Sequence, residues 1–234
     1  MKKIINSRSP GAVYVEFLIV IIPFLILALC TVQIALMYGA QLLVEASAHM
    51  AVRAAVVIMP DDEGFYRGGG INEVGPGSGL HAYEKAPAGS RISMIRRAAA
   101  IPLLPVSVGI RDLKGLLTGR FSLADAFRRQ GAVSMLARLN LDLMPVAVTF
   151  PDTSGGYRTK LGPASKITAR VTYLFTCRVP VAADIMCSGY FKLPYMARKE
   201  LATSTSRIMT YAVSPAKFAV LSAQRSMRNQ GTKS

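Results

Sequence analysis

The sequence predicts an α+β protein in which a long N-terminal transmembrane and amphipathic helix precedes a small exported domain with short helices and an antiparallel C-terminal sheet. Three observations predict this fold. An uncharged apolar run extends from Phe17 to Met37, a pattern with helical period continues to Met59, and the segment 166–179 alternates with a period of two. The expected divisions are a leader over 1–11, the helix over 12–59 and the exported domain over 60–234.

The apolar run is long enough to cross a bilayer. Its 21 residues would rise roughly 30 Å as a helix, which is the thickness of the hydrocarbon core. A cleaved secretory signal has a shorter apolar core of about 7–15 residues, so we reject a simple signal peptide. Lys2, Lys3 and Arg8 precede the run, and this charge bias predicts a single-pass protein with a cytoplasmic N-terminus.

Glu16 directly precedes the apolar run and needs an explanation, because an ionised acid at a bilayer centre costs on the order of 3 kcal/mol. The cost is smaller at the cytoplasmic end of a helix, where the macrodipole also favours an anion. If the chain were cut after Gly11, Ala12 would become the N-terminus and Glu16 the fifth residue, one helical turn along. Its carboxylate could then neutralise the free amine of its own chain or of a packed neighbour, because paired charges cost less in lipid.

At these residues the chain resembles a known family. The stretch GAVYVEF, with Gly11 before the cut and Glu16-Phe17 after it, resembles the processing site of type IV prepilins. More narrowly, it resembles the TadE-like pseudopilins of the tight-adherence (Tad/Flp) pilus system. That family also shows a proline in the apolar run, here Pro23, and then a small-residue helix carrying arginine, here ASAHMAVRAAVV. Flp-type sites often have tyrosine after the glutamate, so Phe17 is a mild departure.

The resemblance covers about 50 residues and implies the roles of five of them. A prepilin peptidase would cut between Gly11 and Ala12, and Glu16, Phe17 and Pro23 would serve subunit assembly. A flexible spot at Pro23 would help the subunit to leave the bilayer. The residues themselves leave an alternative open, which is an anchor with a chance glutamate and an ordinary membrane-helix proline.

Beyond the membrane, the helical pattern predicts a polar side and an apolar side that packs on the exported domain. The polar residues are Gln33, Gln41, Glu45, His49 and Arg53, and the apolar residues are Leu42, Leu43, Ala46, Met50, Ala54 and Val57. Pro60 should end the helix. His49 is expected to be solvated rather than a ligand.

The next segments are predicted to be irregular or helical. The glycine-rich stretch 61–80 is expected to be a loop, and 81–145 to be mostly helical. Ser90 should cap a short helix that ends at Ile101, whereas Pro102 and Pro105 should make the following stretch extended or a turn. Ser122 and Asp125 resemble a capping box that opens a further helix.

The C-terminal part is predicted to contain a β-sheet. Strands are expected at 146–150 and 166–179, where side chains alternate between two faces, and again at 200–213. A short helix is expected over Lys217–Met227. Cys177 and Cys187 can pair as a disulfide if this part is exported to an oxidising compartment, and two reduced thiols are the alternative.

The net charge of the chain limits the kinds of partner that it can bind. The chain has 28 basic and 13 acidic residues, which suits either a solvated surface or contact with nucleic acid, anionic lipid or acidic envelope polymer. The basic residues are scattered, so we expect nucleic acid not to be a partner; a membrane-tethered nucleic-acid binder would rest on charge alone. No catalytic motif and no metal or cofactor motif occurs, and we expect a protein that is a peptidase substrate and not an enzyme.

The resulting hypothesis is a minor pseudopilin in the bacterial inner membrane, with its C-terminal domain in the periplasm. Its partners would be the prepilin peptidase, other pilins or pseudopilins, the assembly platform of the Tad system and the lipid bilayer. It would act in pilus assembly or initiation, in or at the base of the pilus. The alternative is an uncleaved, signal-anchored periplasmic accessory protein of the envelope.

Overall fold

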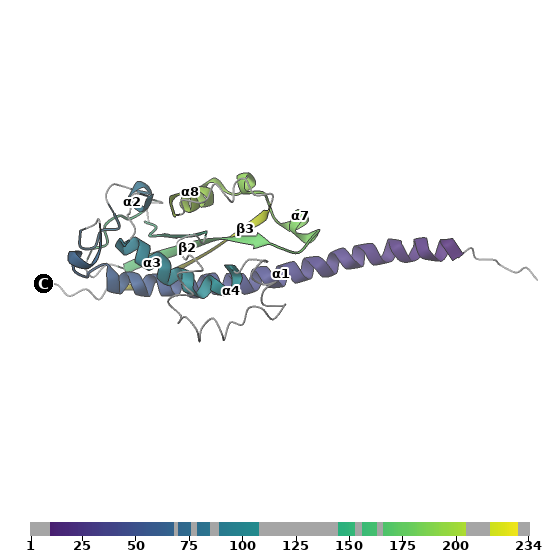
Figure 1. The fold of residues 1–234 in the computed structure, drawn as a ribbon, viewed down its shortest axis with the longest axis horizontal. Helices are drawn as coiled ribbons and strands as arrows, with labels where there is room; N and C mark the ends of the chain where they lie inside the picture. Colours follow the sequence, from purple (N-terminus) through teal and green to yellow (C-terminus); the bar gives the residue numbers. More distant parts are fainter. Residues whose placement is uncertain are drawn as a thin grey trace, which may run out of the picture.

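The computed structural model describes residues 10–67, 70–75, 79–84, 89–107, 145–152, 156–162, 166–204 and 216–228. Within these ranges the chain is α+β, as predicted, with a long N-terminal helix, short helices and a three-stranded antiparallel sheet (Figure 1). The α-helices are α1 (Pro10–Ile58), α2 (His81–Glu84), α3 (Arg91–Ala100), α4 (Leu104–Ser107), α7 (Ala182–Met186) and α8 (Tyr195–Ser204). Three 3₁₀ turns, η1 (Glu63–Phe65), η2 (Ile101–Leu103) and η4 (Tyr190–Lys192), connect them, and the strands are β1 (Val146–Thr149), β2 (Lys166–Cys177) and β3 (Lys217–Arg228).

Helix α1 is the longest element, with 49 residues and a length of roughly 74 Å. Pro10 opens it, in the first turn where a missing N–H costs nothing. Its end at Ile58 agrees with the predicted boundary before Pro60. Figure 1 shows that the C-terminal half of α1 lies along the domain and the N-terminal half projects from it.

The sheet has the order β1-β2-β3, with both pairs antiparallel. Strands β1 and β2 lie where the sequence predicted them. The third strand does not: β3 replaces the helix expected over Lys217–Met227, and it pairs with β2 along its whole length, from Lys166 opposite Arg228 to Cys177 opposite Lys217. The strand expected over 200–213 is also wrong where the structure describes it, because 200–204 belong to α8; the remainder lies outside the described residues.

The main core lies between α1, α3 and one face of the sheet. The predicted alternation of β2 is confirmed, because Ile167, Ala169, Val171, Tyr173 and Phe175 all face this core. The predicted apolar side of α1 is right only in part: Leu43 and Ala54 pack against the core, whereas Leu42, Met50 and Val57 are exposed. The residues that face the core are smaller and lie between the two predicted sides; they are Ala40, Val44, Ser47, Ala48, Ala51, Val52 and Ala55. Small side chains let the helix axis approach the sheet and α3 closely, and the Ser47 hydroxyl donates to the carbonyl oxygen of Ala99 in α3.

The opposite face of the sheet is covered by α8 and η4 (Figure 1). A smaller apolar cluster forms there from Ala147, Leu174, Tyr190, Leu193, Leu201 and Phe218. Beside it, the buried carboxylate of Glu200 accepts hydrogen bonds from the hydroxyls of Thr172 at 2.6 Å and Tyr157 at 2.9 Å. Glu200 thereby ties α8 to the sheet through polar as well as apolar contacts.

The middle of the chain begins as predicted and then departs. Ser90 caps α3 by accepting a hydrogen bond from the amide of Ser93. Of the two predicted alternatives for the next stretch, the turn is found and the extended chain is not, because Pro102 and Pro105 lie in the short helical turns η2 and α4, where proline fits the first turn. The predicted capping box at Ser122 and Asp125 lies outside the described residues.

The described parts of the glycine-rich loop are organised by one buried arginine. The guanidinium of Arg91 donates to the carbonyl oxygens of Gly70 at 2.7 Å and Asp61 at 2.8 Å, and its Nε donates to that of Ile58 at 3.3 Å. It also lies over the ring of Tyr66. A cation at the end of α1 satisfies a carbonyl that has no helical partner and complements the helix dipole.

Candidate membrane anchor and processing segment

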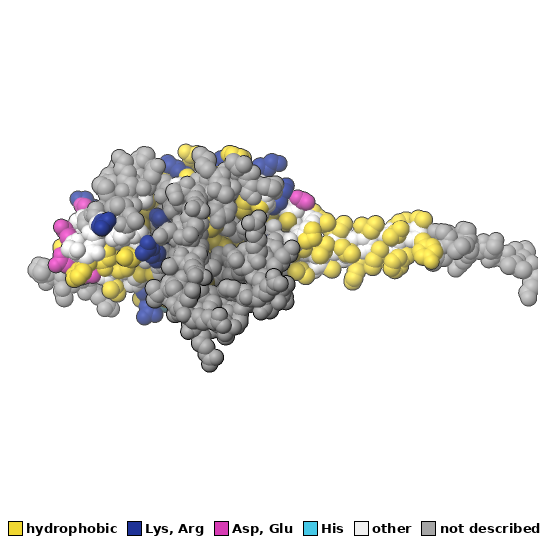
Figure 2. All heavy atoms as spheres, viewed as in Figure 1, with side chains coloured by type: hydrophobic (Ala, Val, Ile, Leu, Met, Phe, Trp, Pro, Cys, Tyr) yellow, Lys and Arg dark blue, Asp and Glu magenta, His cyan; other side chains and the backbone are white. Residues whose placement is uncertain are grey.

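The projecting half of α1 is apolar and exposed along its length. From Tyr14 to Val32 no side chain is buried, and the next residue, Gln33, is buried. Figure 2 shows this segment as an almost continuous apolar surface outside the domain. In the part of the chain that the structure describes, α1 is the one helix long and apolar enough to cross a membrane.

The predicted processing residues lie at the far end of this segment. Gly11 and Ala12 belong to the first turn of α1, which begins at Pro10. Glu16 and Phe17 follow one turn later, and both side chains are exposed. Because the domain starts at Gln33, the structure brings none of these residues together with the sheet or the short helices. Glu16 and Phe17 are therefore accessible to a second protein or to lipid.

Pro23 lies inside α1, and the helix continues through it. Proline has no N–H, so the carbonyl oxygen of Ile19 lacks its helical hydrogen bond. The surrounding side chains are exposed, so no other described element supports the helix at this position. The expectation of a locally loosened helix at Pro23 stays a prediction.

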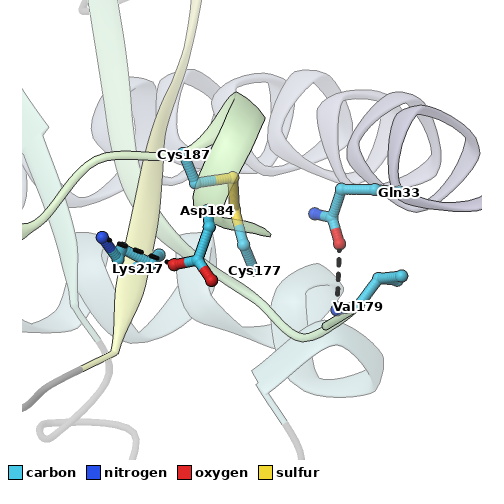
Figure 3. The surroundings of a disulfide bond; sticks show 6 residues. All are labelled: Gln33, Cys177, Val179, Asp184, Cys187 and Lys217. Atoms are coloured by element: carbon cyan, nitrogen blue, oxygen red, sulfur yellow. Dashed lines mark hydrogen bonds and ion pairs between the residues drawn. A yellow bond between two sulfur atoms is a disulfide. The ribbon is translucent and has the colours of Figure 1, made fainter. Parts of the chain in front are cut away.

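At the other end of the projecting segment, a disulfide holds a loop against α1. Cys177 and Cys187 are bonded, with their Cα atoms 6.6 Å apart. We call residues 178–186, which the bond encloses, the disulfide loop. Figure 3 shows the loop beside α1, where the amide of Val179 donates to Oε1 of Gln33 at 3.2 Å.

Gln33 is a contact residue that the sequence pattern places wrongly. The pattern puts it on the polar side of α1, yet its side chain is completely buried. Its Nε2 has no hydrogen-bond partner among the described residues. The signal in the sequence is a single amide side chain near the outer end of an apolar run, where a polar group needs a partner.

Two tyrosines near the sheet have raised pKa values. Burial and the neighbouring Glu200 carboxylate raise the pKa of Tyr157 to about 12. Burial raises the pKa of Tyr83 further, and its hydroxyl donates to the carbonyl oxygen of Arg158 at 2.7 Å. Both are packing tyrosines with satisfied hydroxyls. Within the described ranges, no group of three or more His, Cys, Asp or Glu residues could hold a metal ion.

No protein-family model matches this sequence, and no curated protein or solved structure gives a significant match. What is shown is the architecture of the chain, a long apolar N-terminal helix followed by a small α+β domain. The exposed apolar segment and the disulfide in the C-terminal part indicate a membrane-anchored, exported domain.

Proposed function

We propose that this protein is a minor pseudopilin of a tight-adherence type IV pilus system, cut by a prepilin peptidase and acting in pilus assembly or initiation. One observation carries the proposal: the motif Gly11-Ala12 with Glu16-Phe17 stands at the very start of the exposed apolar half of α1. The role is structural and not enzymatic. The protein would sit in the bacterial inner membrane with its domain in the periplasm.

The accessibility of the motif supports this role. Glu16 is exposed and lies 17 residues before Gln33, so roughly 26 Å of helix separates it from the domain. A peptidase in the membrane could reach the Gly11–Ala12 bond without unfolding the domain. After the cut, the ammonium of Ala12 and the carboxylate of Glu16 would give each subunit one charge of each sign at the same depth.

The main test is the N-terminus of the mature protein. Full-length protein purified from native membranes is expected to begin at Ala12, as shown by intact mass and N-terminal sequencing. The variant Gly11→Leu should keep Met1, because the cut requires a small residue before it. A wild-type protein that keeps Met1 would instead support the uncleaved envelope accessory protein.

The second test separates processing from assembly. Glu16→Gln keeps the size of the side chain and removes its charge, and Glu16→Asp keeps the charge. We expect Glu16→Gln to abolish pilus-dependent surface adhesion and Glu16→Asp to retain more of it, measured at equal amounts of protein in the membrane. Normal maturation and normal adhesion in the Glu16→Gln strain would remove the basis of the proposal.

A further inference from the structure

The end of the domain from which α1 projects carries an exposed apolar surface. Two residues of the disulfide loop form it: Val181 is 44% exposed and Ile185 is 62% exposed. The inner residues of the same loop are held, because Ala183 and Met186 pack against the main core and Val179 binds Gln33. The loop therefore presents two apolar side chains outward from a fixed base.

The position of the loop along α1 relates it to the bilayer. Nineteen residues from Tyr14 to Val32 rise roughly 28 Å, close to the thickness of a hydrocarbon core of about 30 Å. The outer boundary of the hydrocarbon then lies at the level of Gln33, where the loop is docked. If the span is instead Phe17–Met37, the boundary lies four residues further on, and the loop lies roughly 6 Å inside it.

The backbone of the loop adds an independent observation. Val181 has a φ of 66°, a conformation that is unfavourable for a β-branched residue and that glycine or asparagine would adopt more easily. Residues held in such conformations often serve a function. An apolar contact made by the exposed valine side chain would explain why a residue with a local cost occupies this position.

We propose that the disulfide loop is an interfacial membrane contact, in which Val181 and Ile185 enter the outer interface of the bilayer that α1 crosses. Interfacial apolar groups lie about 5–10 Å deep, at the boundary of headgroups and acyl chains. Asp184, which precedes Ile185 in the loop, pairs with Lys217 at 3.5 Å (Figure 3). This ion pair would keep the loop at the interface, because charges are costly in the hydrocarbon. The inference depends on α1 spanning a bilayer and is independent of processing at Gly11.

The sequence contains no tryptophan, so single substitutions give an unambiguous fluorescent probe of depth. We would place Ile185→Trp, Leu27→Trp and Phe65→Trp separately in the full chain, reconstituted in nanodiscs of brominated phosphatidylcholine. Leu27 is exposed on the projecting half of α1, and Phe65 is exposed beyond the opposite end of the helix. Bromine should quench the fluorescence of the tryptophan at 185 roughly half as strongly as the fluorescence of the tryptophan at 27, or more strongly. It should leave the fluorescence of the tryptophan at 65 nearly unaffected.

Three results would overturn the proposal. The tryptophan at 185 could be quenched by aqueous acrylamide and not by bromine, which would place the loop in water. Protection from both quenchers would place protein and not lipid on it. If bromine does not quench the tryptophan at 27, α1 does not span the bilayer, and the proposed membrane contact of the loop is then wrong as well.

The unsubstituted chain provides a measurement that does not depend on the folding of a variant. Amides of residues 181–185 should exchange with deuterium several-fold more slowly in nanodiscs than in a short-chain detergent. Equal exchange in both media would contradict the contact. Neither readout changes if the N-terminus is found to be Met1, so failure here and failure of the pseudopilin role are distinguishable.

Discussion

Arg91 shows how one side chain determines the structure of a region that composition predicts to be irregular. Its guanidinium serves three carbonyl oxygens from α1 and from the glycine-rich loop, and it contacts an aromatic ring. Hydrogen bonds to a charged donor are worth more than neutral ones, and a buried acceptor that loses its donor carries a desolvation cost.

We expect Arg91→Ala to lower the free energy of unfolding by about 3 kcal/mol, because three acceptors lose their donor at once. Thermal unfolding of the full chain in detergent micelles, followed by circular dichroism, measures the loss. Arg67→Ala, at an exposed arginine in the same loop, is the matched control and should change stability little. Equal effects of the two substitutions would contradict the role assigned to Arg91.

The raised pKa of Tyr157 predicts how the stability of the domain changes at alkaline pH. Its pKa is raised to about 12 by burial and by Glu200, so the folded state holds this proton more tightly than the unfolded state does. The contribution to stability is complete below the ordinary tyrosine pKa of about 10 and is lost as pH rises through 12.

The free energy of unfolding should therefore fall between about pH 10 and 12. Tyr157→Phe should make this fall shallower, because phenylalanine has no hydroxyl proton to release. Chemical denaturation at several pH values measures both slopes. Tyr195→Phe is the control, since this tyrosine is exposed. A wild-type slope that Tyr157→Phe leaves unchanged would refute the assignment.

At the scale of elements, the contact between α1 and the sheet depends on small side chains. Ala48, Ala51 and Ala55 are completely buried on the face that meets the core, whereas Leu42 is exposed. A close-packed interface has little room for a larger residue, so its tolerance to substitution is opposite to what hydrophobicity alone suggests.

We expect Ala51→Leu to destabilise the domain by about 1–3 kcal/mol through overpacking, and Leu42→Ala to cost much less. Thermal unfolding of both variants under the same conditions tests this. A larger loss of stability for Leu42→Ala than for Ala51→Leu would support the apolar side predicted from the sequence and contradict the packing described above.

Several elements could be predicted from sequence because their local signals agree with their environment. Helix α1, its end near Pro60, the Ser90 cap and the alternation of β2 all have such signals. Strand β3 does not: its Ala, Leu, Gln, Arg and Met residues favour a helix, and pairing along the whole of β2 overrides that preference. The core face of α1 was missed for a related reason, because alanine and serine carry no strong hydrophobic signal.

The residues of the candidate site divide in the same way. Gly11, Ala12, Glu16, Phe17 and Pro23 are contiguous or nearly so, and a local pattern can therefore identify them. Gln33 acts through a contact with Val179, 146 residues away, and no local pattern reports such a contact. The disulfide loop became a candidate surface only once the fold placed it beside the end of the projecting helix.

At the scale of the whole molecule, the loop that the disulfide closes lies between the sheet and α1. It closes a short loop whose inner side rests on α1, and it ends β2 beside the start of β3. A bond with a sequence separation of 10 stabilises a protein by about 3 kcal/mol on the chain-entropy account.

Replacing Cys177 and Cys187 together by serine should therefore lower the free energy of unfolding by about 3 kcal/mol. It should also accelerate deuterium exchange at the amide of Val179, because the loop is no longer held against Gln33. Cys30→Ser is the control, since Cys30 is a free thiol on the projecting half of α1. Unchanged exchange at Val179 would show that the loop is held on α1 without the bond.

One continuous helix serves both as membrane anchor and as a wall of the domain core, with no linker between the two uses. Beyond Pro23 the helix runs without a break to Ile58, so tilting this part of α1 by a given angle tilts the folded domain through the same angle. A force applied to the domain is therefore transmitted along the helix axis to the apolar segment.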